Sequence, residues 1–177
     1  MQVSAKFYYF TLINCVLLSN RVHTRTKFTN IKCNSLDKKF ADFDKCRLSV
    51  PSRGVIALTV DVKVFQVPVT NISINLALFK KATGFRPFLY NVTVDFCDFM
   101  ANKKRYPFVN IFVNIFIKQS NINHTCPFNH ELIVKNLILR DEMFDRMPVP
   151  EGEYLFKLMV AAYNDWKADV GVYFTRE

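Results

Sequence analysis

Several stretches of the sequence alternate apolar and polar residues with a period of two, which is the pattern of a β-strand that buries one face. In residues 55–67 the apolar parity holds Ile56, Leu58, Val60, Val62 and Val64, and Ala57, Thr59, Asp61 and Lys63 take the other parity. In residues 70–80 it holds Ile72, Ile74, Leu76 and Leu78, against Asn71, Ser73 and Asn75. In residues 87–96 it holds Phe88, Tyr90, Val92, Val94 and Phe96, against Leu89, Asn91, Thr93 and Asp95. We therefore expect three half-buried strands.

N-glycosylation sequons provide an independent check of this parity. Asn71-Ile-Ser and Asn91-Val-Thr are acceptor sites, and both asparagines fall on the face that the alternation assigns to solvent. A third sequon, Asn123-His-Thr, lies in a polar stretch. We predict glycosylation at Asn71, Asn91 and Asn123.

Residues 107–119, PFVNIFVNIFIKQ, fit both a helix and a strand. Phe108, Ile111, Phe112, Ile115 and Phe116 have helical spacing, whereas Val109, Ile111, Val113, Ile115 and Ile117 alternate as in a strand. We prefer the helix because the polar residues recur every four positions and Pro107 suits a first helical turn.

The C-terminal third again predicts strands, at residues 130–139, 154–163 and 168–176. The stretch 147–153, with two prolines and a glycine, interrupts them, and Asn164 and Asp165 suit a turn between the last two. The sum is six to eight antiparallel strands and about one helix. The predicted fold class is mainly β, a β-sandwich in a single domain over residues 25–177.

The first 24 residues have the order of a signal peptide. Lys6 precedes a run of about a dozen mostly apolar residues at 7–18, and Ser19 and Thr24 offer small residues for cleavage. The alternative is that residues 7–18 form a buried first strand. Beyond this run no apolar stretch approaches the roughly 18 residues that a membrane span requires. We therefore predict a secreted protein.

Cysteine usage agrees with an oxidising compartment. Cys15 lies in the predicted signal peptide, and Cys33, Cys46, Cys97 and Cys126 remain. Four cysteines behind a signal peptide indicate two disulfides, with three connectivities open. We favour Cys33–Cys46 and Cys97–Cys126 because these partners are nearest along the chain.

The formal net charge is +9, and the basic residues are scattered. Nucleic-acid-binding proteins more often show a basic stripe or a fold signature, so we expect no nucleic-acid partner. A positive surface that faces anionic lipid or an acidic protein stays an alternative to a merely basic, solvated surface.

Catalytic signatures are scarce. His124, Cys126 and His130 have a spacing that resembles metal ligation, but a structural zinc site requires four ligands, and a nucleophilic Cys126 requires a free thiol. If Cys126 is in a disulfide, it serves neither as a metal ligand nor as a nucleophile. The stretch around it is then a glycosylated structural loop. Asp95 and Asp98 fit a strand end or a cap better than a catalytic pair. We expect no enzyme activity, no metal and no cofactor.

Four blocks of sequence carry a resemblance to a known family. They are FTNIKCNSLDKKFADFDKCRLSV, FRPFLYNVTVDFCDFM, SNINHTCPF and PVPEGEYLFKLMV, in this order. Together they resemble a family of small secreted insect proteins of unknown function that is expanded in fruit flies. That family is similar to the chemosensory B-type proteins, and remotely to the ML lipid-recognition group that includes the ganglioside activator.

The resemblance implies an immunoglobulin-like sandwich whose sheets separate into a cup for an apolar ligand. The residues expected to line such a cup are Val62, Val64, Ile74, Leu76, Tyr90, Val92, Phe96, Phe112 and Phe116. The implied function is a secreted, non-enzymatic binder of a lipid or other hydrophobic small molecule, with a role in chemosensation or pheromone response and a cell-surface receptor as a further partner. The alternative is a secreted protein–protein interaction module with a filled core, such as a receptor ligand or immune factor.

Overall fold

The computed structural model describes residues 25–147 and 149–177, so the predicted signal peptide at residues 1–24 lies outside the described residues. The strands are β1 (Thr26–Ser35), β2 (Ala41–Ser52), β3 (Val55–Val64), β4 (Ile72–Lys81), β5 (Phe85–Asp95), β6 (Leu132–Ile138), β7 (Gly152–Ala162) and β8 (Asp165–Arg176). Helices α2 (Phe96–Ala101) and α3 (Pro107–Phe116) separate β5 from β6, with short 3-10 turns at Lys103–Arg105, Ile117–Gln119 and Asp141–Phe144.

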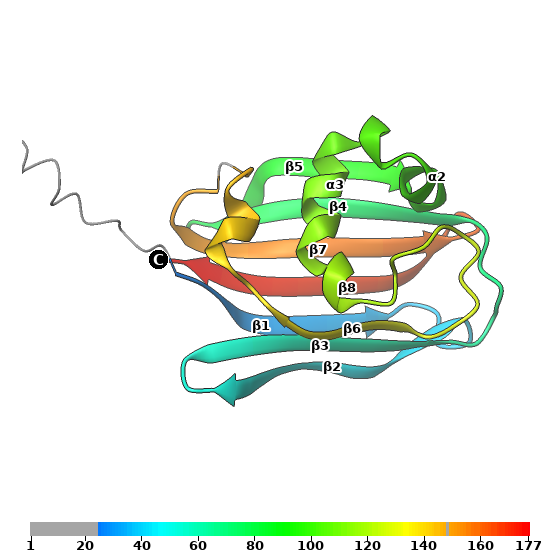
Figure 1. Cartoon of the computed structure of the whole chain (residues 1–177), viewed down its shortest axis with the longest axis horizontal. Coiled ribbons are helices and arrows are strands. Elements are labelled where there is room, and N and C mark those ends of the chain that lie inside the picture. The colour runs from blue at the N-terminus through cyan, green and yellow to red at the C-terminus, as the bar shows by residue number, and fades with distance from the viewer. Residues whose placement is uncertain (1–24, 148) are drawn as a thin grey trace, which may run out of the picture.

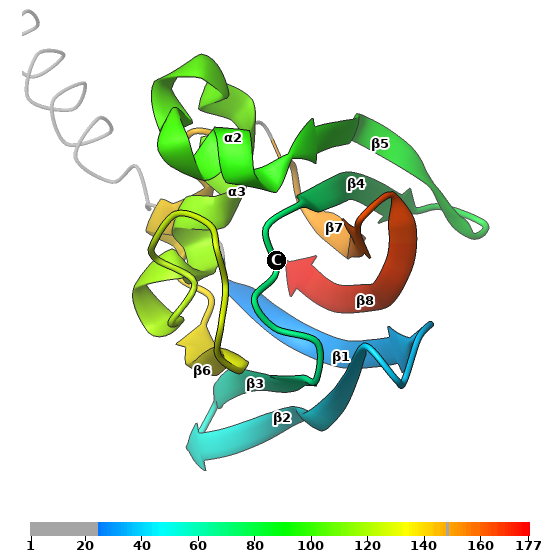
Figure 2. The ribbon, with the colours of Figure 1, turned by 90° about the vertical axis from the view of Figure 1, so that its right-hand side faces the viewer.

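The strands form two antiparallel sheets. One has five strands in the order β1-β8-β7-β4-β5, and the other has three in the order β2-β3-β6. The sheets turn around a common interior when the molecule is viewed from one end (Figure 2). The mainly β fold with one main helix is therefore confirmed.

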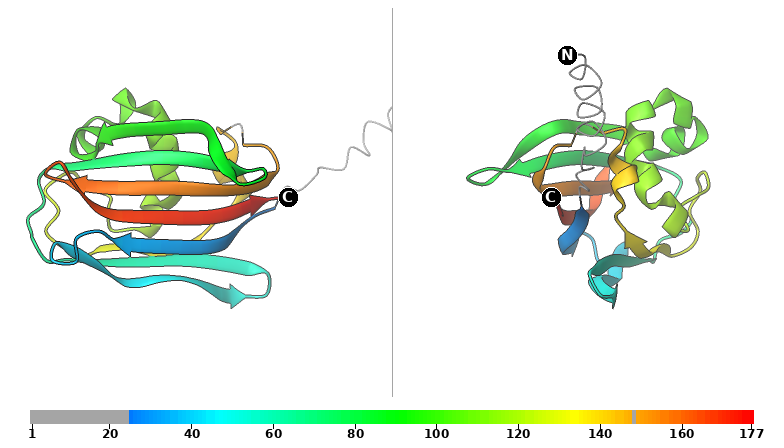
Figure 3. Two further views of the ribbon diagram at one scale, coloured as in Figure 1. Left: turned by 180° about the vertical axis from the view of Figure 1, so that it is seen from behind. Right: turned by 60° about the vertical axis from the view of Figure 1, so that its left-hand side comes forward.

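Helix α3 crosses the inner side of the larger sheet, in front of β4, β7 and β8 (Figure 1), and the view from behind places it beyond those strands (Figure 3). Its buried residues are Val109, Phe112 and Val113, whereas Asn114 is exposed. The prediction of a helix rather than a strand over residues 107–119 is confirmed, because the polar residues at intervals of four face away from the interior. No helix among the described residues is long and apolar enough to cross a membrane.

Both disulfides of the favoured pairing are present. Cys33 of β1 is bonded to Cys46 of β2, and these strands belong to different sheets, so the bond links the two layers. Cys97 in α2 is bonded to Cys126 in the loop that precedes β6. Each bond thus joins parts of the chain that the backbone ladders do not hold together.

The alternation is correct for the inward parity of β4, where Ile72, Ile74, Leu76 and Leu78 are all buried. It is incomplete for β3, because Ala57 and Asp61, assigned to solvent, are also buried. Strand β3 lies between β2 and β6, and Lys45 of β2 reaches across to Asp61, with Nζ 3.0 Å from Oδ2. On the outer face of a central strand, a small side chain, or one that pairs with a residue of the neighbouring strand, can therefore be buried.

Two local predictions require correction. Phe96 was predicted to be the last residue of the strand over residues 87–96, but it is the first residue of α2. The helix begins there because the Asp95 side chain accepts a hydrogen bond from the Asp98 backbone N–H and caps it. The β7–β8 turn consists of Tyr163 and Asn164, both with positive φ, whereas Asp165 already belongs to β8. A two-residue turn with both residues in the left-handed region matches the twist of a hairpin.

Candidate functional site

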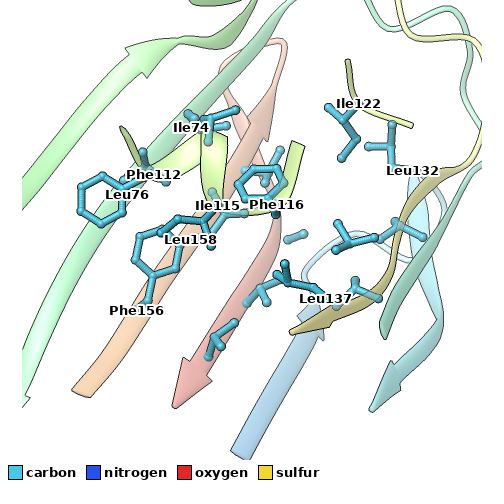
Figure 4. A pocket seen from close by; sticks show the side chains of 18 of the residues that line it. Ile74, Leu76, Phe112, Ile115, Phe116, Ile122, Leu132, Leu137, Phe156 and Leu158 are labelled. Atoms are coloured by element: carbon cyan, nitrogen blue, oxygen red, sulfur yellow. The ribbon is translucent and has the colours of Figure 1, made fainter. Parts of the chain in front are cut away.

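A partly open cavity of about 260 Å³ lies between the two sheets and α3. Its wall takes side chains from β1 to β4, from β6 to β8, from α2 and α3, and from several connecting segments. Among the residues that the structure describes, Lys167 is the one lining residue that is not apolar. The close-up view shows labelled side chains of β4, β6, β7 and α3 converging on this space, among them Ile74, Leu137, Phe156 and Phe116 (Figure 4).

Most residues expected to line a cup do lie in this wall. They are Val62 and Val64 of β3, Ile74 and Leu76 of β4, Phe96 of α2, and Phe112 and Phe116 of α3. These side chains come from four separate elements, and the fold brings them together around one space. Their contact with a ligand stays a prediction.

Tyr90 and Val92, also expected in the wall, lie outside it. Strand β5 is the edge of the five-stranded sheet, and the start of α3 packs on it. The Tyr90 ring centroid is 3.8 Å from that of Phe108 and 5.5 Å from that of Phe112. Tyr90 therefore anchors α3 to the sheet from the far side of the helix instead of facing the cavity.

Other parts of the wall were not named from the sequence. Strand β8 contributes Ala168, Val170, Val172 and Phe174. These residues alternate along a stretch predicted to be a strand, so the period-two pattern could have identified them as wall residues. Phe144, Met147 and Val149 come from the irregular segment before β7 and carry no periodic signal. Their place in the wall depends on the tertiary fold.

Lys167 lies at one end of the cavity with its charge turned away from the apolar interior. Its side chain is 13% exposed, and Nζ is 2.8 Å from Asp37 Oδ2 and 2.7 Å from Asp165 Oδ2. Nζ also lies 5.0 Å from the centroid of the Phe40 ring, which belongs to the wall. The hydrocarbon stem thus completes the apolar wall, and the ammonium is held by two carboxylates and an aromatic face.

The charges in this cluster stabilise one another. Hydrogen bonds to Asp165 and Asp37 raise the pKa of Lys167, and the hydrogen bond from Lys167 lowers the pKa of Asp37. Both shifts favour the charged forms of Lys167 and Asp37. With the Asp165 carboxylate, whose Oδ2 lies 2.7 Å from Lys167 Nζ, the cluster has two formal negative charges and one positive charge.

The loop with His124, Cys126 and His130 closes the cavity near this end. Cys126 is in its disulfide, and His124 Nε2 lies 2.7 Å from His130 Nε2. The His124 ring packs on Phe128, with 4.6 Å between centroids, and Phe128 belongs to the wall. Within residues 25–147 and 149–177, no group of three or more His, Cys, Asp or Glu is placed to hold a metal ion. The disulfide of Cys126 and the packing of His124 on Phe128 give both residues a structural role in this loop.

The three sequon asparagines, Asn71, Asn91 and Asn123, are all exposed. Asn91 Oδ1 accepts a hydrogen bond from Asn75 Nδ2 at 2.9 Å on the outer face of the sheet. All three positions are sterically open to a glycan, and glycosylation itself stays a prediction.

The fold and the site define a class: a mainly β protein whose two disulfide-linked sheets enclose an apolar cavity. A DUF1091 domain, described as a protein of unknown function, is found at residues 74–156. The match runs from β4 into β7 and includes α3 and the Cys97–Cys126 disulfide. Comparison with curated proteins gives no match.

Proposed function

We propose that the protein is a secreted, non-enzymatic binding protein that carries a lipid or another hydrophobic small molecule in the cavity between its sheets. The observation that carries the proposal is the composition of the wall, where every described residue except Lys167 is apolar. Apolar pockets of a few hundred Å³ are the usual form of sites for hydrophobic ligands. Burial of apolar ligand surface there supplies binding free energy at roughly 25 cal/mol per Å² before the costs of association.

Secretion agrees with the two disulfides, because such bonds persist in oxidising compartments. A role in chemosensation or pheromone response, with a receptor as partner, rests on the resemblance to secreted insect proteins and chemosensory B-type proteins. The proposed relation to the ML lipid-recognition group rests on the same resemblance.

A cavity-filling variant tests the proposal. Val160 of β7 lies in the wall, whereas its neighbour Met159 does not. Val160→Phe should reduce the uptake of an uncharged fluorescent probe, N-phenyl-1-naphthylamine, by at least about tenfold in affinity, because its ring occupies the space the probe requires. Met159→Phe adds similar bulk to the opposite face of the same strand and should leave uptake unchanged.

Two outcomes would contradict binding in the cavity. One is an equal loss of probe uptake in both variants, and the other is no loss of probe uptake in either variant. Filling a cavity should also be tolerated, whereas the same change in a close-packed core costs about 1–3 kcal/mol. Thermal unfolding of Val160→Phe therefore provides a second readout.

The second candidate function is a protein–protein interaction module. Five large apolar side chains are exposed in three loops and at the start of β8, namely Leu36, Phe65, Val67, Tyr163 and Trp166. The loops are tied together, since the Leu36 N–H donates to the Lys167 carbonyl and the Tyr163 hydroxyl donates to the Pro68 carbonyl. Exposed apolar clusters of this kind mark interaction sites. The exposed Asn71 sequon lies beside them, and a glycan there would restrict a partner's approach.

A further inference from the structure

Charge at the end of the cavity determines which ligands fit. We propose that Asp37 and Asp165, by holding Lys167, make the cavity selective for uncharged long-chain compounds and exclude fatty-acid anions. The inference rests on the proposed function, because it names the class of ligand for that same cavity.

The first argument is that the wall offers a ligand few hydrogen-bonding groups. Within residues 25–147 and 149–177, Lys167 is the one polar residue of the wall. Among the described residues, the buried side-chain atoms without a hydrogen-bond partner are Asp61 Oδ1, Gln119 Oε1 and Thr175 Oγ1, and none of these residues lines the cavity. A polar ligand group placed inside would lose its hydrogen bonds to water without replacement.

The second argument is that Lys167 is already paired with two carboxylates. A free lysine at the end of an apolar cavity would attract a carboxylate. Here two of its three N–H groups meet Asp37 Oδ2 at 2.8 Å and Asp165 Oδ2 at 2.7 Å, and its ammonium also faces the Phe40 ring. One cation with two anions leaves a formal charge of −1, so a ligand carboxylate that reached this end would meet net repulsion.

The chain offers a variant that removes the two charges with little change of shape. Asp37 Oδ1 also accepts from the backbone N–H groups of Lys39 and Phe40, at 3.1 Å and 3.2 Å. Asparagine keeps an oxygen acceptor for these turn contacts. Asp165 is largely exposed at the start of β8. The double variant Asp37→Asn/Asp165→Asn should therefore fold and leave the Lys167 ammonium without a counter-ion.

The experiment measures competition of methyl hexadecanoate and of hexadecanoate against N-phenyl-1-naphthylamine on the secreted protein. The two competitors share a chain and differ in the charge of the end group. The unaltered protein should bind the ester at least about tenfold more tightly than the acid. The double variant should gain affinity for the acid by a similar factor and keep its affinity for the ester. Lys167→Met, the matched control without the ammonium, should show no gain for the acid.

Each outcome has one meaning. Equal binding of acid and ester by the unaltered protein, or no gain for the acid in the double variant, would overturn the role of Asp37 and Asp165 while leaving the carrier function intact. Displacement by neither competitor, together with no probe uptake, would remove the carrier function and the inference with it. A gain for the acid in Lys167→Met, where both carboxylates remain without their cation, would show that these carboxylates do not exclude the acid, and it would overturn the inference.

Discussion

Lys167 shows how a single charged residue is accommodated in an apolar wall. A partly buried ammonium is costly unless it is paired, and Asp37 and Asp165 supply the pairing for Lys167. The sequence contains no periodic signal for this cluster, since Asp37 lies 130 residues before Lys167. Ion pairs between residues so far apart in the sequence are determined by the tertiary fold, and no local sequence pattern predicts them.

The Asp37–Lys167 pair predicts a pH dependence of stability. The pKa of Asp37 is lowered in the folded protein from an ordinary value of 3.8, chiefly by the hydrogen bond from Lys167. A lowered pKa contributes stability that is present above pH 3.8 and is lost as pH falls through the lower folded-state value. Urea unfolding should therefore show a higher midpoint for the unaltered protein than for Asp37→Asn at neutral pH. The gap should close in acid, and a gap that is the same at every pH would contradict the assignment.

Asp95 is a residue whose role the sequence indicated in part. The pattern allowed a strand end or a cap, and the structure makes it the N-cap of α2, with Oδ1 2.9 Å from the Asp98 backbone nitrogen. Asp95→Ala should lower the free energy of unfolding by about 1 kcal/mol, because it removes this acceptor. Asp95→Asn retains an acceptor and should lie within a few tenths of a kcal/mol of the unaltered protein. Equal losses in both would point to a charge effect in place of capping.

At the scale of elements, the period-two alternation located β3, β4 and β5 and the inward parity of β4, because a strand with one buried face has to alternate. Helix α2 escaped prediction because its first residue, Phe96, continues the parity of β5. Residues 26–52 form β1 and β2, which no strand prediction covered. Their burial pattern is irregular, since each contains a register shift or an exposed stretch.

The disulfides act at this scale because each joins two elements. Removal of the Cys97–Cys126 bond in Cys97→Ala/Cys126→Ala should lower the free energy of unfolding by about 2–5 kcal/mol. The chain-entropy model ranks the two bonds by the loops they close, with separations of 29 and 13 residues. Cys33→Ala/Cys46→Ala should therefore cost about 0.7 kcal/mol less. Denaturant unfolding measures both, and a larger loss for the shorter loop would show that linking the two sheets outweighs loop entropy.

At the scale of the whole molecule, the unanswered question from the sequence was whether the inward residues fill a core or surround a space. Ile74 and Leu76 show the same parity in either case, so no pattern separates the two. The separation of the sheets depends on how the chain passes from β1 in one sheet to β2 in the other, and on α3 lying across the larger sheet. The resemblance suggested a cup, and the cavity of about 260 Å³ is what the assembled elements produce.

The most direct test of the central claim is native mass spectrometry of the protein purified from a secretory host, followed by organic extraction and lipid analysis of the same material. Binding in the cavity predicts an apolar, uncharged species that co-purifies in stoichiometric amount and is depleted in Val160→Phe but not in Met159→Phe. Protein that carries nothing, and that takes up nothing from an added panel of long-chain compounds, would contradict the carrier function.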